Sequence, residues 1–168
     1  MSFETHPRLA RTKARLYERC LPCLTGLLDQ LRGNPAQVNL THAWDCWKVV
    51  AVVRDEAEAM ELLARFAETF PGEYCYGKLG GKRPGRDTAA LVFHTEDAGR
   101  RDQLEGMLRH VVDAHCPGRT VFVSRGCSDP YEAVLGPWPG WTRTCPVRHP
   151  ERVPEVVARL REMLYGKS

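Results

Sequence analysis

A run of cations and glycines between residues 77 and 87 is the first part of the sequence that could do chemistry. Four basic residues alternate with four glycines: Lys78, Lys82, Arg83 and Arg86 with Gly77, Gly80, Gly81 and Gly85. Glycine lets backbone N–H groups approach an anion closely, and lysine and arginine supply charge and donors for phosphate. The run is not a P-loop, because Arg83 stands where that motif requires serine or threonine.

Two aromatic residues immediately precede this basic run. Tyr74 and Tyr76 alternate with Cys75, so both rings would lie on one face of a strand. Aromatic rings beside cations suit the stacking of bases. The leading hypothesis is therefore a non-enzymatic binding or regulatory module for a phosphate-bearing ligand, either a nucleotide or single-stranded nucleic acid. The alternative is a solvated turn whose charges protect a sheet edge.

A single cysteine carries the second hypothesis. Cys127 follows Arg125 and Gly126 and precedes a predicted helix start. The helix dipole and a nearby guanidinium would both favour a thiolate at this position. A nucleophile also needs an orienting base, and His94 at the end of a predicted strand could supply one. The sequence thus predicts a thiol-dependent enzyme or redox protein with Cys127, Arg125 and His94 as catalytic residues, or else a small residue in a tight turn.

The segment Cys20-Leu21-Pro22-Cys23 has the spacing of a redox dithiol or of half a metal site. It lies in a helical stretch rather than after a strand, and the sequence contains no second CxxC. A zinc or iron–sulfur site would need two more ligands, and the other five cysteines are isolated in the sequence. We therefore interpret this segment as a packed helix bent or split at Pro22, and we expect no metal. The sequence leaves any cofactor undetermined.

The elements that must position these residues follow from the hydrophobic pattern between Trp47 and Leu135. Strand patterns occur at residues 48–53, 73–79, 88–94 and 120–124, and helical stripes at 60–70 and 104–112. The order strand, helix, strand, strand, helix, strand predicts an α+β fold of ferredoxin-like topology, with a four-stranded antiparallel sheet and two packing helices. The first and third strands are continuous apolar runs, so we expect them in the middle of the sheet.

The two ends of the chain extend this core. We expect a helical extension and connector over residues 1–46, the core over 47–136, and a Pro/Trp-rich loop with a final helix over 137–168, all in a single domain. Trp138 and Trp141 in that loop either pack against the domain or form an exposed patch for a partner. A third hypothesis is accordingly a structural or interaction subunit that forms a homo-oligomer through this loop or a sheet edge.

Composition excludes a few classes of protein. No uninterrupted apolar run is longer than Val49 to Val53, which is far shorter than the roughly 20 residues of a membrane span. The first residues lack the apolar stretch of a signal peptide, and seven cysteines are an odd number, so we expect a cytoplasmic protein with neither structural disulfides nor a membrane partner. The net charge of +3 argues neither for nor against nucleic acid.

Overall fold

A computed structural model describes residues 2–4, 12–80 and 87–166 of the chain. The chain divides into two compact units, Met1–Leu16 with Trp47–Ser124 and Tyr17–Cys46 with Arg125–Ser168, which we call the sheet unit and the helical unit. This division differs from the one expected from the sequence, since the residues after Ser124 belong with the segment that precedes Trp47.

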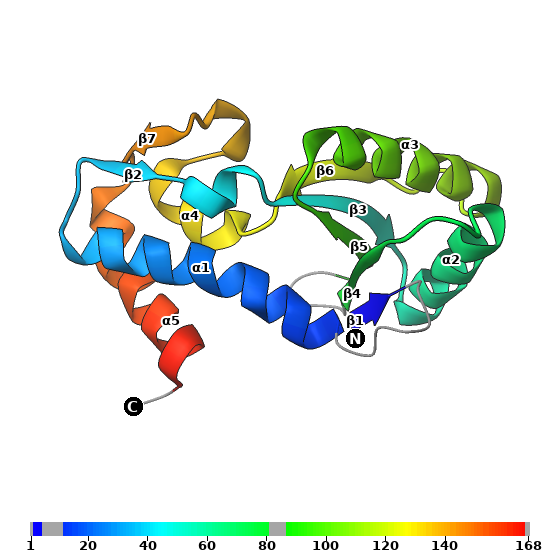
Figure 1. Ribbon diagram of the computed structural model, residues 1–168, viewed down its shortest axis with the longest axis horizontal. Helices are drawn as coiled ribbons and strands as arrows, with labels where there is room; N and C mark the ends of the chain where they lie inside the picture. The colour runs from blue at the N-terminus through cyan, green and yellow to red at the C-terminus, as the bar shows by residue number, and fades with distance from the viewer. Residues whose placement is uncertain (1, 5–11, 81–86, 167–168) are drawn as a thin grey trace. The chain divides into compact units, whose positions relative to one another are not determined.

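The sheet unit is built on a sheet with the strand order β1-β4-β5-β3-β6 (Figure 1). Its strands are β1 (Ser2–Glu4), β3 (Trp47–Val53), β4 (Tyr76–Gly80), β5 (Ala89–Thr95) and β6 (Val121–Arg125). The predicted four-stranded antiparallel sheet is present, and the two continuous apolar strands, β3 and β5, lie inside it. The strand order differs from the prediction because β1 pairs with β4 and adds a strand at that edge.

Helices α2 (Glu56–Thr69) and α3 (Ala98–His115) close the core of this unit. Alternate residues of β3, among them Val49 and Ala51, are fully buried in one cluster with both helices. Phe66 of α2 meets Phe93 of β5 edge-on, with ring centroids 4.8 Å apart. The helical stripes predicted from the sequence therefore form the apolar faces that cover the strands.

Asp55 and Glu58, three residues apart, predict a capping box at the start of α2, and the structure forms half of it. Asp55 is the N-cap residue, and its carboxylate accepts a hydrogen bond from the backbone N–H of Glu58. The Glu58 carboxylate accepts one from the backbone N–H of Arg54, not from that of Asp55, and a second from the guanidinium of Arg119 at 3.1 Å. This carboxylate thus ties the start of α2 to the segment that enters β6.

The described residues of the helical unit form three α-helices and a two-stranded sheet, besides short 3-10 helices at Thr41–Trp44, Trp138–Gly140 and Pro150–Arg152. The α-helices are α1 (Thr12–Arg32), α4 (Ser128–Leu135) and α5 (Val153–Tyr165), and the antiparallel strands are β2 (Gln37–Asn39) and β7 (Thr144–Pro146). Pro22 lies inside α1 without splitting it, so of the two expected outcomes, a bend or a split, the split is excluded. The predicted start of this helix at Thr5 lies outside the described residues. None of the helices in the described part of the chain is long and apolar enough to cross a bilayer.

The Pro/Trp-rich loop packs at least one of its two indoles into this unit. Trp141 is buried in the core cluster and donates its indole N–H to the carbonyl of Gly136 at 2.9 Å. Trp138 is half-buried and packs against the same cluster. Trp141 therefore contributes to the core and not to an exposed aromatic patch.

Candidate functional site

Four of the seven cysteines meet in the helical unit. The Cys127 thiol lies within interaction distance of three other thiols, those of Cys20, Cys23 and Cys46. These residues come from three separate segments: α1, the turn before β3, and the start of α4. Cys23, Cys46 and Cys127 are buried, whereas Cys20 is half-buried. No disulfide joins them. We call this group the four-cysteine cluster.

The cluster supplies the two further ligands that a metal site at the CxxC segment would need. Cys20 and Cys23 lie three residues apart in α1, which places them on one helix face. Cys46 and Cys127, which the sequence presents as isolated cysteines, are the two further thiols that a metal site needs. Sequence reasoning missed the cluster because residues from distant segments leave no spacing signature.

Gly126 is the residue that lets Cys46 and Cys127 approach. Its backbone N–H donates a 2.7 Å hydrogen bond to the carbonyl of Cys46, which pairs the two cysteine-bearing segments. A Cβ atom on Gly126 would lie 2.1 Å from the Cys46 sulfur, far inside van der Waals contact. A glycine is therefore required here for a close approach rather than for an unusual backbone angle.

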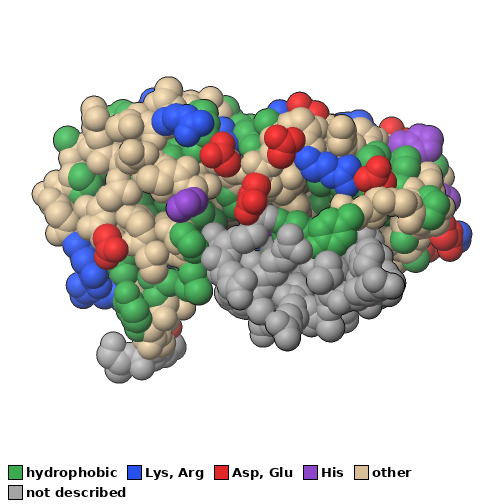
Figure 2. Space-filling view, in the orientation of Figure 1, with side chains coloured by type: hydrophobic (Ala, Val, Ile, Leu, Met, Phe, Trp, Pro, Cys, Tyr) green, Lys and Arg blue, Asp and Glu red, His purple; other side chains and the backbone are tan. Residues whose placement is uncertain are grey.

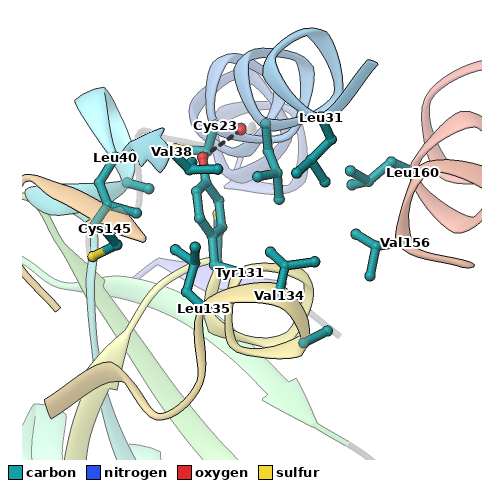
Figure 3. Packing of buried hydrophobic residues seen from close by; sticks show 14 of the residues in the cluster. Cys23, Leu31, Val38, Leu40, Tyr131, Val134, Leu135, Cys145, Val156 and Leu160 are labelled. Carbon is teal, nitrogen blue, oxygen red and sulfur yellow. Dashed lines mark hydrogen bonds between the residues drawn. The ribbon is translucent and has the colours of Figure 1, made fainter. Parts of the chain in front are cut away.

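Helix α4 contributes both a thiol and a clamp. Tyr131 lies four residues after Cys127, so both side chains share one face of α4. The Tyr131 hydroxyl donates a 2.8 Å hydrogen bond to the carbonyl of Cys23, deep in the core of the unit (Figure 3). Burial raises the pKa of Tyr131, so its hydroxyl stays protonated and able to donate.

Cys127 occupies the N-cap position of α4, where the sequence predicted Ser128 or Asp129, and no side chain caps the helix. Hydrogen bonds to the Cys20 thiol and to its other two thiol partners, together with burial, raise the pKa of the Cys127 thiol. The expectation that the helix dipole and Arg125 would lower this pKa was wrong. In the absence of a metal, Cys127 is a buried, protonated thiol.

Arg125 and Trp44 flank the four-cysteine cluster. Arg125 is 6% exposed, and its guanidinium carbon lies 4.3 Å from the centroid of the Trp44 ring. Arg125 precedes Cys127 by two residues, and Trp44 precedes Cys46 by two. The stacked pair therefore sits at the entry to both cysteine-bearing segments.

His94 belongs to the sheet unit, on β5. Its buried ring stacks nearly parallel to that of Tyr76, with centroids 6.4 Å apart and 15° between the planes. The structure thus gives Cys127 and Arg125 a common neighbourhood within the helical unit and gives His94 an aromatic partner in the other unit.

The basic run is only partly described. Lys78 and Gly80 lie on β4, Tyr76 is buried on the same strand, and Tyr74 just before it is half-buried. Gly81, Lys82, Arg83 and Arg86 lie outside the described residues. On the face seen in Figure 2, the described Lys and Arg side chains are interspersed with Asp and Glu. The hypothesis of a phosphate-binding hairpin therefore stays a prediction.

Another buried cysteine of the helical unit is held differently. The Cys145 sulfur accepts a hydrogen bond from the Thr142 N–H at 3.3 Å and donates one to the Thr142 carbonyl at 3.1 Å, within one turn.

Among the residues that the structure describes, no three Cys, His, Asp or Glu side chains are already spaced as ligands of a metal ion. The four-cysteine cluster is thus a set of thiols gathered around that of Cys127, whose protons an ion would have to displace.

Comparisons with protein-family models, with curated proteins and with solved structures found no match. Function is therefore inferred from the residues and their geometry.

Proposed function

We propose that the four-cysteine cluster binds a single thiophilic metal ion, zinc, and that this ion is the structural centre of the helical unit. The observation that carries the proposal is the contact of the Cys127 thiol with three other cysteines. Four cysteine thiolates are a common ligand set for structural zinc.

The contact between the thiols favours one ion over an iron–sulfur cluster. Four sulfurs at about 2.3 Å from a tetrahedral zinc ion lie about 3.8 Å from one another, close to van der Waals contact. An iron–sulfur cluster places several iron and sulfide ions between its cysteines and keeps them farther apart. Zinc binding would release the thiol protons and turn the side chains toward the ion.

The surroundings support a centre of negative charge. The N-terminus of α4 carries the positive end of its helix dipole and begins at Cys127 without a side-chain cap. An ion held here would join α1, the turn before β3 and α4, which are otherwise linked by Tyr131 and by the Gly126–Cys46 hydrogen bond. The free energy of metal binding would then contribute directly to folding.

A thiol enzyme centred on Cys127 is the weaker candidate. Cys127 is only 8% exposed, so a substrate would have little access to its sulfur. Cys20 is more exposed, and it contacts Cys127. The arrangement thus supports a ligand set better than a nucleophile.

The same proposal includes two broader features. We infer a ferredoxin-like core in the sheet unit, supported by the inner strand order β4-β5-β3-β6, with β1 as an addition at the edge. We also infer a cytoplasmic location, because a metal site of this kind needs its cysteines kept reduced.

Metal analysis of cysteine variants tests the proposal. The full chain is purified under reducing conditions without chelators, and its metal content is measured by elemental and native mass spectrometry. We expect about one zinc per chain, lost on replacing Cys20, Cys23, Cys46 or Cys127 by serine and retained in Cys145→Ser and Cys116→Ser. A chain that takes up no zinc, equal losses in the control variants, or stoichiometric iron and sulfide would overturn the proposal.

A further inference from the structure

A zinc ion bound by four thiolates carries a net charge of −2, and three of the four ligands here are buried. Burying net charge is costly unless opposite charge lies close to it. The positive end of the α4 helix dipole offsets only part of this negative charge, because a helix N-terminus is equivalent to about half an elementary charge. A full positive charge beside the cluster would complete the compensation.

Arg125 carries such a charge two residues before Cys127. Arg125 is only 6% exposed, and its Nε and Nη1 atoms are buried. Its guanidinium carbon lies over the Trp44 ring, 4.3 Å from the centroid, and this cation–π contact helps to hold it in position. The Gly126–Cys46 hydrogen bond joins the segment that carries Arg125 and Cys127 to the segment that carries Trp44 and Cys46.

Arg143 offers a matched comparison on the same ring. Its guanidinium carbon lies 5.8 Å from the Trp44 centroid, but the residue is exposed. Solvent screens an exposed charge far more than a buried one. The two arginines therefore share an aromatic partner and differ in burial and in distance along the chain from a cysteine ligand.

We propose that Arg125, positioned by Trp44, compensates the negative charge of the metal–thiolate centre and thereby sets its affinity for zinc. This inference rests on the proposed zinc site. It assigns Arg125 an electrostatic positioning role beside the ligands, in place of the catalytic role that the sequence suggested. Groups outside the ligand shell typically change metal affinity by 10- to 100-fold when altered.

The test measures zinc affinity of the full chain by competition with a chromophoric chelator. We expect Arg125→Met to weaken zinc binding at least about tenfold, Arg125→Lys to restore it to within a few-fold because the charge returns, and Arg143→Met to leave it unchanged. Trp44→Leu keeps the charge but removes its support, so we expect an intermediate loss. Circular dichroism of each variant reports whether it is folded.

The outcomes separate this inference from the zinc proposal. If the unchanged chain binds zinc and Arg125→Met binds it equally tightly, the inference is wrong and the zinc site stands. The inference is also wrong if Arg125→Lys binds zinc as weakly as Arg125→Met, because the shape of the arginine side chain and not its charge would then set the affinity. If Arg125→Met does not fold, unchanged affinity in Trp44→Leu overturns the inference. An unchanged chain that binds no zinc overturns both.

Discussion

The hydroxyl of Tyr131 donates a 2.8 Å hydrogen bond to the main-chain carbonyl of Cys23. Tyr131 lies one turn after Cys127 on α4, and Cys23 closes the CxxC segment of α1. Helix α4 therefore begins beside one member of the cysteine cluster, its N-cap residue Cys127, and also fixes the segment that carries two others.

Replacing Tyr131 by phenylalanine isolates this bond. The variant keeps the ring and leaves a buried carbonyl without this donor, so we expect the free energy of unfolding to fall by about 1–2 kcal/mol. Urea denaturation measures the change. Tyr165→Phe is the control, because Tyr165 is 69% exposed and should lose nothing. Equal stability of both variants would show that the bond does not hold α4 to α1.

Two glycine-to-alanine substitutions should change the free energy of unfolding in opposite directions. In Gly126→Ala the new methyl would meet the Cys46 sulfur, so we expect a loss of about 1–3 kcal/mol together with reduced zinc content. In Gly106→Ala the methyl meets nothing within 4 Å inside α3, so we expect a gain of about 0.5–1 kcal/mol. Thermal unfolding compares the two. A tolerated Gly126→Ala would contradict the close approach of Gly126 and Cys46.

The lowered pKa of the Glu58 carboxyl group predicts that the protein loses stability in acid. Burial raises its pKa, but hydrogen bonds from the Arg54 N–H and from Arg119 outweigh burial and hold the pKa below 4.5. A lowered pKa in the folded state means that Glu58 stabilises the fold fully above its unfolded pKa, and that this contribution disappears as pH falls through the folded value.

We therefore expect Glu58→Gln to lose stability at neutral pH and to show a weaker decline of unfolding free energy between about pH 5 and pH 3. Glu61→Gln on the same helix is the control, since Glu61 is exposed and makes only a long 4.0 Å ion pair. Both variants keep all cysteines, so acid loss of metal affects them equally. Parallel pH curves for the two would refute the role of the Glu58 hydrogen bonds.

The basic hairpin remains testable independently of the cysteines. If it binds a phosphate-bearing ligand, replacing Lys82 and Arg83 by alanine should weaken binding of a labelled single-stranded oligonucleotide, and affinity should fall steeply with salt. Removing two exposed cations from α5, Arg159 and Arg161, is the matched control. Binding that does not change with salt would rule the hypothesis out.

The sequence predicted the elements whose signals are local. The apolar runs of β3 and β5 correctly placed both strands inside the sheet, and the Asp55–Glu58 pair correctly marked the start of α2. The strand β1 was missed because three residues, Ser2–Glu4, are too few for a periodic pattern, and its pairing with β4 depends on residues far along the chain.

The candidate site was predictable only in part. CxxC spacing identified Cys20 and Cys23, and Arg125 and Cys127 drew attention through the helix start that follows them. Nothing in the sequence joins Cys46 to them, because the contact arises when α1, the turn before β3 and α4 pack together. Burial among thiols, which no spacing shows, also reversed the expected direction of the Cys127 pKa.

X-ray absorption at the zinc edge of the purified full chain tests the central claim most directly, because it counts the atoms bound to the ion. We predict four sulfur neighbours at about 2.3 Å, unchanged in Cys145→Ser and reduced in Cys46→Ser. A first shell of nitrogen or oxygen, or a chain that holds no zinc after reduction and zinc addition, would contradict a four-cysteine metal centre.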